Sequence, residues 1–318
     1  MAEFLIVALQ LLRIHDPINQ SMKQNMALTV NALLENPGFH DFILEQTTAF
    51  LTIHRTDPKL ASIFGTHQRW MLAHVGMAQY FLDALSGASE PVIVMARYLE
   101  QVRRYEIASV NTADSFLKEM VVYGIALHAT TGDRRHKPII PSPRALETLR
   151  HWVGIHLHTL DDIDGGNRLD RFEHDPGLLW HLHPQITERL LNTPSIRVPP
   201  PRYGLFTWLN SGGVLVDWLM TSVKNSEVVD GHFLTQVRSV PRLAEMFRIS
   251  RTHLTRKLRE AEDMGSIGWL GQRGRSTMWI SKALVDEYNF YQAQKLSVID
   301  ETFQEVAGPP MILSAVQT

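Results

Sequence analysis

Residues 243–267, LAEMFRISRTHLTRKLREAEDMGSI, constrain the fold of this chain more than any other stretch. Ser239 can accept hydrogen bonds from the free N–H groups at a helix start, and Pro241 falls in the first turn, where a missing N–H costs nothing. Ile249 is an apolar turn residue, and Ser250 is a favourable N-cap for a following helix. The stretch therefore predicts two short helices joined by a sharp turn.

The second of these helices, expected over 250–264, has an apolar face and a cationic one. Leu254, Leu258 and Ala261 share the apolar face. The other faces carry Arg251, Thr252, Thr255, Arg256 and Arg259. Gly265 then supplies the left-handed residue that ends many helices. This is the pattern of a helix-turn-helix in which one helix packs on one side and presents positive charge on the other.

A β-hairpin with two arginines at its tip is expected after this helix. The apolar residues of its two strands are Ile267, Trp269, Met278 and Ile280. They flank the turn GQRGR, residues 271–275, which contains Arg273 and Arg275. The order of helix, turn, helix and basic hairpin resembles the winged helix-turn-helix of bacterial transcription regulators. The resemblance implies that the second helix enters the major groove of DNA and that the hairpin, or wing, contacts the minor groove or the backbone beside it.

The charge distribution favours a DNA contact at this end of the chain. The 318 residues have a formal net charge of −2, which argues against a protein that coats nucleic acid indiscriminately. Residues 235–285, however, contain ten Lys or Arg against four Asp or Glu, so the remainder is net acidic. A basic helix alone is usually a solvated surface. The cap, the turn, the packed face, the glycine and the basic hairpin together favour DNA binding.

We therefore expect this unit to read duplex DNA. Arg251 and Arg256 are the candidates for guanine edges, and Thr252 and Thr255 for bases or phosphates. The full set of expected contacts is Ser250, Arg251, Thr252, Thr255, Arg256, Arg259, Arg273 and Arg275.

The same pattern recurs earlier in the chain. Ser109 and Gly124 are separated by fifteen residues, as are Ser250 and Gly265. On this alignment the apolar face of the first copy consists of Ala113, Leu117 and Met120. Upstream, Tyr105 and Ile107 match Phe247 and Ile249 if the first copy has one extra turn residue. The chain therefore predicts two winged-helix units.

The first copy is less basic along its helix. Its candidate DNA contacts there are Asn111, Ser115 and Lys118, but Asp114 and Glu119 lie among them. Its hairpin, expected over 125–141, carries the further candidates Arg134, Arg135 and His136.

The sequence Asp-Arg-Arg in this hairpin, followed by a long helix over 143–160, resembles the multiple-antibiotic-resistance-regulator (MarR) family. In that family a wing arginine reaches the minor groove, and a following helix forms the dimer interface. Family members are normally single-unit chains that pair as homodimers, and this chain departs from them in length. The resemblance therefore implies a duplication in which one chain, as a monomeric pseudo-dimer or as part of a homodimer, supplies both units.

The MarR resemblance also implies a small, often aromatic effector between the scaffold helices and the winged units. The aromatic candidates are Trp70, Trp152, Trp208 and Trp218. Tryptophans at such spacings belong more often to a core than to a ligand site.

The chain is long enough for two domains, and its pattern predicts a mainly α fold with small β-hairpin wings, arranged as a tandem winged helix-turn-helix. We expect the first unit and N-terminal helices over 1–165, and the second unit with its flanking helices over 202–306. A connector is expected over 166–201, with a helical section near 186–191, and a flexible tail over 307–318. Apolar helices over 205–223 and 284–303 are expected to flank the second unit.

Composition excludes several classes of protein. Without cysteine, the chain has no disulfide, thiol nucleophile or Cys-ligated zinc. The apolar run in the first seventeen residues is too short to span a bilayer and lacks a basic flank or a cleavage signal, which predicts a cytoplasmic protein with no membrane partner. No phosphate-binding GxxxxGK[ST] loop occurs. We expect neither a cofactor nor an enzymatic activity.

Two alternatives of other classes remain. A metal-dependent enzyme is suggested by clustered histidines and carboxylates: His151, His156, His158, Asp161, Asp162, His174, His181 and His183. Against it, His156 and His158 lie two apart on a predicted helix and so point in different directions, and no HExxH motif occurs. Tandem winged helices also serve as protein-interaction modules in chromosome-segregation complexes, a role that suits the acidic residues of the first unit.

Overall fold

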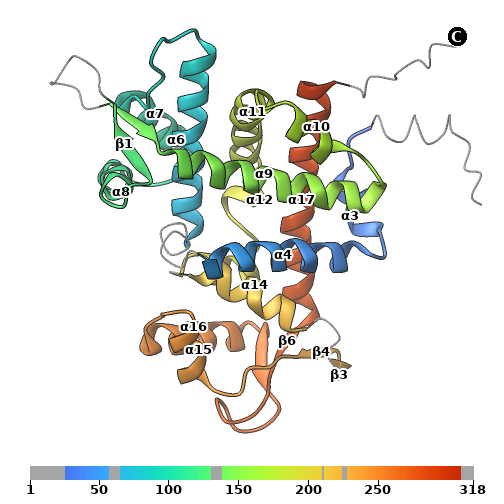
Figure 1. Cartoon of the computed structure of the whole chain (residues 1–318). Helices are drawn as coiled ribbons and strands as arrows, with labels where there is room; N and C mark the ends of the chain where they lie inside the picture. Colours follow the sequence, from blue (N-terminus) through green and yellow to red (C-terminus); the bar gives the residue numbers. More distant parts are fainter. Residues whose placement is uncertain (1–25, 57–64, 130–137, 210, 224–227, 309–318) are drawn as a thin grey trace, which may run out of the picture.

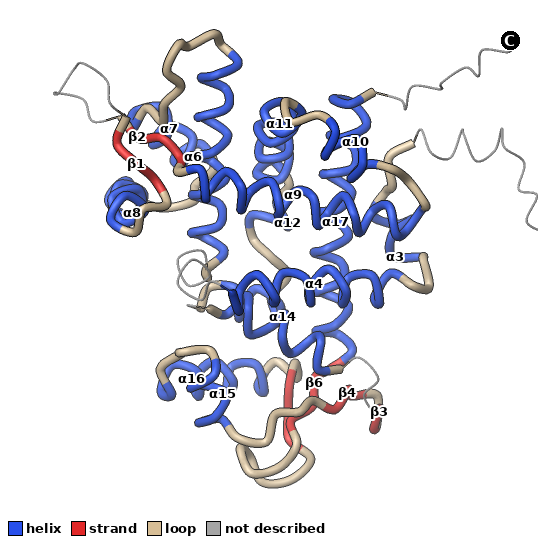
Figure 2. Tube along the Cα trace, in the orientation of Figure 1, coloured by secondary structure: helices blue, strands red, loops and turns tan. Residues whose placement is uncertain are grey.

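The computed structural model describes residues 26–56, 65–129, 138–209, 211–223 and 228–308. Within these ranges the chain is mainly helical, with two small antiparallel sheets (Figures 1 and 2). The predicted fold class is confirmed at this level. The apolar N-terminal run, most of the expected tail and the tip of the first hairpin lie outside the described residues.

A helical body makes up most of the molecule. Its helices are α3 (Val30–Glu35), α4 (Phe39–Thr56), α6 (His67–Leu85), α9 (Pro143–Asp164), α10 (Arg168–His174), α11 (Leu178–Asn192), α12 (Pro194–Arg197), α13 (Pro201–Thr207), α14 (Gly212–Ser222) and α17 (Lys282–Ala307). Helix α11 packs against α6 and α17, and α4 packs against α9 and α14. Their inward faces bury a continuous set of apolar side chains that extends from Leu33 to Phe303. No helix in the described ranges has the length and apolar character needed to cross a membrane.

The segment expected as a connector, 166–201, is folded into this body. It consists largely of α10, α11 and α12, and the predicted helical section near 186–191 lies within α11. Leu182, Ile186 and Leu190 recur every four residues along α11, and none of them exposes more than 1% of its surface. This apolar stripe is the physical reason why the segment packs as a helix instead of extending between two bodies.

Two segments on the helical body share one order of elements. The first runs from α6 through an isolated bridge at Ile93 to α7 (Met95–Arg104), α8 (Val110–Val122), β1 (Ala126–His128), β2 (Ile139–Pro141) and α9. The second runs from α14 through β3 (Val228–Val229) and β4 (His232–Leu234) to α15 (Val240–Met246), α16 (Arg251–Asp263), β5 (Ile267–Trp269), β6 (Met278–Ser281) and α17.

Strand pairing is also equivalent in the two segments. In the second, the strand order is β3-β4-β6-β5. In the first, β1 pairs with β2, and the backbone N–H of Ile93 donates to the carbonyl of Ile139 at 2.7 Å. Ile93 therefore occupies the place of β4, next to the strand that follows the hairpin loop.

The turns of the two segments match in detail. Glu106 and Arg248, which join the paired helices, both have φ of 53°. The glycines that follow the second helix, Gly124 and Gly265, have φ of 70° and 63°, so both occupy the left-handed region that glycine favours. Helix α8 begins three residues after Ile107 and α16 two residues after Ile249, which confirms the extra turn residue predicted for the first copy.

The predicted packed faces are confirmed. Leu254, Leu258 and Ala261 of α16 are fully buried. The equivalent residues of α8 are buried as well, namely Ala113, Leu117 and Met120.

The single helix expected over 205–223 is wrong. The chain forms α13 and α14 instead, separated near Ser211, whose φ is 59°. Gly212 begins α14 so close to the carbonyl oxygen of Phe206 that any Cβ at this position would overlap it. This break depends on a close backbone approach between residues six positions apart, which apolar periodicity does not report.

Candidate nucleic-acid interface and an internal cavity

Helix α16 presents its cationic face to solvent. Arg251, Thr252, Arg256 and Arg259 are exposed, whereas Thr255 is half-buried. Ser250 is exposed at the N-cap position, but its hydroxyl makes no capping bond, unlike that of Ser239, which accepts from the backbone N–H of Arg242. An exposed serine hydroxyl at a helix start remains free to bind another group.

Ion pairs with acidic residues of α16 restrain the cationic side chains of this helix to different degrees. Lys257 donates to Glu260 at 2.6 Å, and this hydrogen bond lowers the pKa of the Glu260 carboxyl. Arg256 lies 3.8 Å from the same carboxylate, and 65% of its side chain is exposed. Arg256 is therefore only loosely held.

The hairpin loop between β5 and β6, residues 270–277, lies against α16. Glu262 accepts from Trp269 Nε1 at 2.7 Å and from Arg273 Nε at 2.8 Å. A second guanidinium nitrogen of Arg273 donates to the carbonyl of Thr255 at 3.4 Å. Arg273, expected at a DNA groove, thus joins the loop to the helix in this structure, whereas Arg275 is exposed beyond the turn at Gly274.

Three further arginines of segment 235–285 are exposed but were not among the predicted contacts. They are Arg238, Arg242 and Arg248. They contribute to the excess of basic residues over 235–285, which could have indicated them. The helical periodicity, however, predicted contacts on α16 only.

The corresponding surface of α8 is exposed but less positive. Asn111, Ser115 and Lys118 all face solvent. Lys118 donates to Asp114 at 2.7 Å, and Glu119 pairs with Arg69 at 2.9 Å. The predicted wing contacts Arg134, Arg135 and His136 lie outside the described residues.

The histidines considered as metal ligands belong to separate environments. His74 Nδ1 lies 2.9 Å from His183 Nε2, His156 Nδ1 lies 2.7 Å from the carbonyl of Trp152, and His158 pairs with Asp162 at the surface. Burial lowers the pKa of His74 to about 3 and those of His156 and His183 well below the usual value. Over the described ranges, no three His, Asp or Glu side chains are grouped so that they could hold a metal ion.

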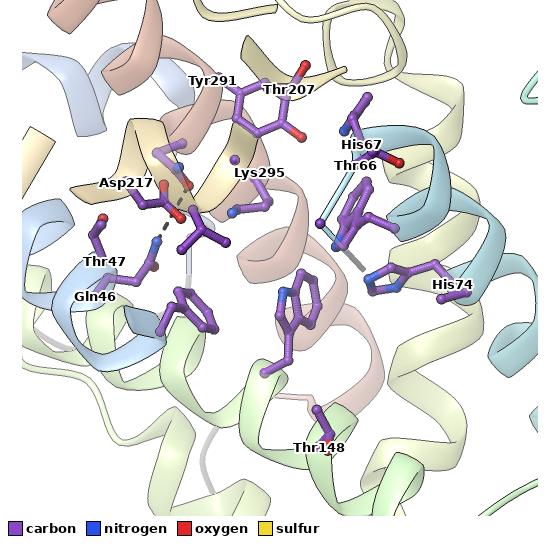
Figure 3. Close-up of a pocket in the computed structure, with 18 of the residues that line it drawn as sticks. Gln46, Thr47, Thr66, His67, His74, Thr148, Thr207, Asp217, Tyr291 and Lys295 are labelled. Atoms are coloured by element: carbon purple, nitrogen blue, oxygen red, sulfur yellow. Dashed lines mark hydrogen bonds between the residues drawn. The ribbon is translucent and has the colours of Figure 1, made fainter. Parts of the chain in front are cut away.

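A cavity of about 280 Å³, partly open to solvent, lies among the helices of the body (Figure 3). Its wall includes side chains from α4, α6, α9, α13, α14 and α17. Of the four tryptophans predicted for an effector site, Trp70 and Trp152 line it. The Trp208 ring makes an edge-on contact with the ring of His67, which lines the cavity. Trp218 packs against Phe247 instead, with ring centroids 5.7 Å apart.

Two oppositely charged side chains border this cavity. Lys295 of α17 is 9% exposed, and burial lowers its pKa to about 8. Asp217 of α14 accepts a hydrogen bond from Tyr288 at 2.9 Å, and burial raises its pKa to about 6. Among the described residues, the Lys295 ammonium has no hydrogen bond or ion pair, and it lies 5.8 Å from the centre of the Tyr291 ring.

Comparison with known proteins identifies no relative. No protein-family model, curated protein or solved structure matches the chain. The cationic face of α16 with loop 270–277, and the cavity beside Lys295, are therefore the two features from which a function can be inferred.

Proposed function

We propose that this protein is a sequence-specific, double-stranded-DNA-binding transcriptional regulator with two winged-helix units in one chain. The observation that carries the proposal is α16 itself. Its apolar face is fully buried, its opposite face presents Arg251, Arg256 and Arg259 to solvent, and an arginine-bearing loop is fastened beside it through Glu262. A rigid helix that projects arginines is suited to the width of the major groove.

The shared element order supports the tandem arrangement. Residues 67–164 and 212–307 each contain a helix, a short extended segment, two helices and a hairpin, followed by a long helix. Helices α9 and α17, which follow the two hairpins, contact each other in the body. We infer a MarR-like pseudo-dimer in which this contact takes the place of an interface between two chains.

Specificity would come from the α16 side chains that reach base edges. Arg251 and Arg256 can each donate two hydrogen bonds to the O6 and N7 atoms of guanine, while Thr252 and Thr255 contact bases or phosphates. Ser250 and Arg259 suit the flanking backbone. We assign the minor-groove contact to Arg275, because Arg273 is held by Glu262.

The first unit would contribute a weaker half of the interface. Asn111, Ser115 and Lys118 supply polar contacts, but Asp114 neutralises Lys118 and lowers the local attraction for phosphate. The wing residues Arg134, Arg135 and His136 belong to the same proposal. We expect the two half-sites of an operator to differ in sequence and in the affinity that each contributes.

Selection of duplexes from a random pool by the full chain tests this function. The wild type should enrich two unlike half-sites, and its affinity should fall by about 10³-fold or more between ~50 and ~200 mM salt. The double variant Arg251→Ala/Arg256→Ala should lose about 1 to 3 kcal/mol per guanine contact at the selected site.

Lys282→Ala is the matched control, because Lys282 is an exposed cation in an i,i+4 ion pair of the same basic segment but lies outside α16. It should retain wild-type affinity for the selected duplex. If the wild type binds no duplex at ~50 mM salt, DNA regulation is excluded and a protein-interaction role for the winged units takes its place.

A further inference from the structure

The cavity in the helical body has walls that suit a flat, apolar ligand. Trp70 of α6 and Trp152 of α9 have ring centroids 6.3 Å apart, and Phe50 of α4 also lines the space. Its volume of about 280 Å³ lies near the lower end of the range for small-molecule sites. A ligand with a single aromatic ring, or with two fused rings, matches these dimensions.

Lys295 places a cation at this cavity that has neither a hydrogen bond nor an ion pair among the residues that the structure describes. Its side chain is more than nine-tenths buried, and Figure 3 shows it extending into the space that the lining residues enclose. A buried ammonium that lacks hydrogen bonds is costly, and a ligand carboxylate would supply the missing ion pair.

At Asp217 the cavity presents hydrogen-bond acceptors, which require donors from a ligand. Asp217 already accepts from Tyr288, and its carboxylate has further capacity to accept. Gln46 also lines the cavity, and its Oε1 is buried without a hydrogen-bond partner among the described residues. Figure 3 shows Gln46 and Asp217 toward the same end of the cavity. An amino group placed there would satisfy both acceptors.

The other titratable groups that face the cavity are neutral near pH 7. On α6, burial lowers the pKa of His67 to about 4 and that of His74 to about 3. On α13 and α17, burial raises the pKa of the lining tyrosines Tyr203, Tyr288 and Tyr291. Among the described residues, the cavity therefore holds one cation and one anion. They form no ion pair at contact distance, although each charge favours the charged form of the other.

We propose that the cavity binds a small aromatic zwitterion, namely an aromatic amino acid. Its carboxylate pairs with Lys295, its amino group donates to Asp217 and Gln46, and its ring packs beside Trp70 and Trp152.

Such a ligand would join helices that flank both winged segments. Asp217 lies on α14 and Lys295 on α17, the first and last helices of the second segment, while Trp70 and Trp152 lie on α6 and α9, which flank the first. Binding would favour one relative placement of the two units and so change their joint affinity for DNA. This regulatory consequence rests on the proposed function, whereas ligand binding itself does not.

Calorimetric titration of the full chain, without DNA, tests the proposal with two matched probe series. One is L-tryptophan, indole-3-propionate, tryptamine and indole, and the other is L-phenylalanine, 3-phenylpropionate, 2-phenylethylamine and ethylbenzene. In at least one series the zwitterion should bind about 10- to 100-fold more tightly than the probe that lacks either charged group. Equal binding of all four members of each series, or no binding in either, would overturn it.

Two variants test separately the binding of the carboxylate and the binding of the amino group. Lys295→Met should abolish the advantage of the carboxylate, and Asp217→Asn should reduce the advantage of the amino group, while Lys282→Met should change neither. Thermal unfolding of each variant verifies that it is folded, and Met is expected to be accepted because it replaces a buried charge with an apolar chain of similar length. An unchanged probe preference in folded Lys295→Met would contradict the assignment of the carboxylate site.

DNA binding is measured separately with the duplex selected above. If the zwitterion binds but leaves DNA affinity unchanged, the regulatory consequence fails and the ligand site stands. If no duplex binds, only the proposed function fails.

Discussion

Arg168 joins the ends of three helices through buried ion pairs. Its guanidinium, with 4% of the side chain exposed, donates to Asp300 of α17 and Asp164 of α9 at 2.7 Å each, and to Asp161 at 3.1 Å. Asp300 has no exposed surface and also accepts from the backbone N–H of Leu28 at 2.7 Å. Asp161 and Asp164, which directly precede the segment expected as a connector, are therefore part of a structural ion network.

Replacing this arginine should be strongly destabilising. Arg168→Met leaves the Asp300 carboxylate buried without its cation and should cost about 3 to 5 kcal/mol of unfolding free energy, measured by urea denaturation. Arg189→Met is the surface comparison, because Arg189 pairs with Glu301 and Glu305, both more than half exposed. That change should cost about 1 kcal/mol or less. Equal losses of unfolding free energy in the two variants would show that the buried network contributes no more to stability than a surface ion pair.

Ligand binding should depend on pH in a bell-shaped manner. Asp217, with a pKa of about 6, loses its charge as the pH falls through that value, and Lys295, with a pKa of about 8, loses its charge as the pH rises through that value. The zwitterionic probe should therefore bind most tightly between about pH 6 and 8. Calorimetry across this range checks the curve, and Asp217→Asn should remove its acidic limb. Constant affinity from pH 5 to about 9 would contradict it.

At the scale of elements, the two arginines of loop 270–277 should have different roles. Arg275→Ala removes an exposed cation and should make the slope of log affinity against log salt shallower by about 1, if Arg275 contacts a phosphate. Arg273→Ala should leave this slope closer to the wild-type value but increase hydrogen exchange in the loop, because it removes the bond to Glu262.

Salt titrations and hydrogen exchange on the two variants distinguish these outcomes. A loop as protected in Arg273→Ala as in the wild type would show that Glu262 does not hold it through Arg273.

Where capping residues and glycines mark the ends of helices, the sequence predicted the helix boundaries closely. The helix expected over 250–264 is α16, Arg251–Asp263, and the long helix expected from residue 143 is α9. The capping serines Ser142 and Ser281 accept from backbone N–H groups of their helices at 3.2 and 3.3 Å. These signals are local, since each depends on a few neighbouring residues.

At the scale of the whole molecule, α11 should contribute to global stability. Ile186 is fully buried and lies on a helix that contacts both α6 and α17, so Ile186→Ala should lower the unfolding free energy by about 2 to 5 kcal/mol. Val198→Ala, in the same segment but 72% exposed, should have little effect. Denaturant unfolding of both variants provides the measurement. A small loss for Ile186→Ala would restore the interpretation of 166–201 as a simple connector.

The candidate DNA surface was predictable in part. Periodicity placed Arg251 and Arg256 opposite a buried face, and the structure exposes both. Periodicity did not indicate that Arg273 folds onto Glu262, because that pair forms only when the hairpin lies against α16. The cavity was still less predictable. Trp70 and Trp152 were candidates, but Lys295 and Asp217 were not, since nothing in the sequences of α17 and α14 distinguishes a charged residue that faces a cavity from one that faces solvent.

The sequence by itself determined the two helix-turn-helix stretches and the repeat of their pattern around Ser109 and Ser250, because these depend on neighbours within a few positions along the chain. Only the tertiary structure decided that 166–201 belongs to the core and that Lys295 and Asp217 border one cavity. Those outcomes depend on which helix faces meet, and residues that meet in space here are separated by up to hundreds of positions in sequence. Burial then sets their charge and their available partners.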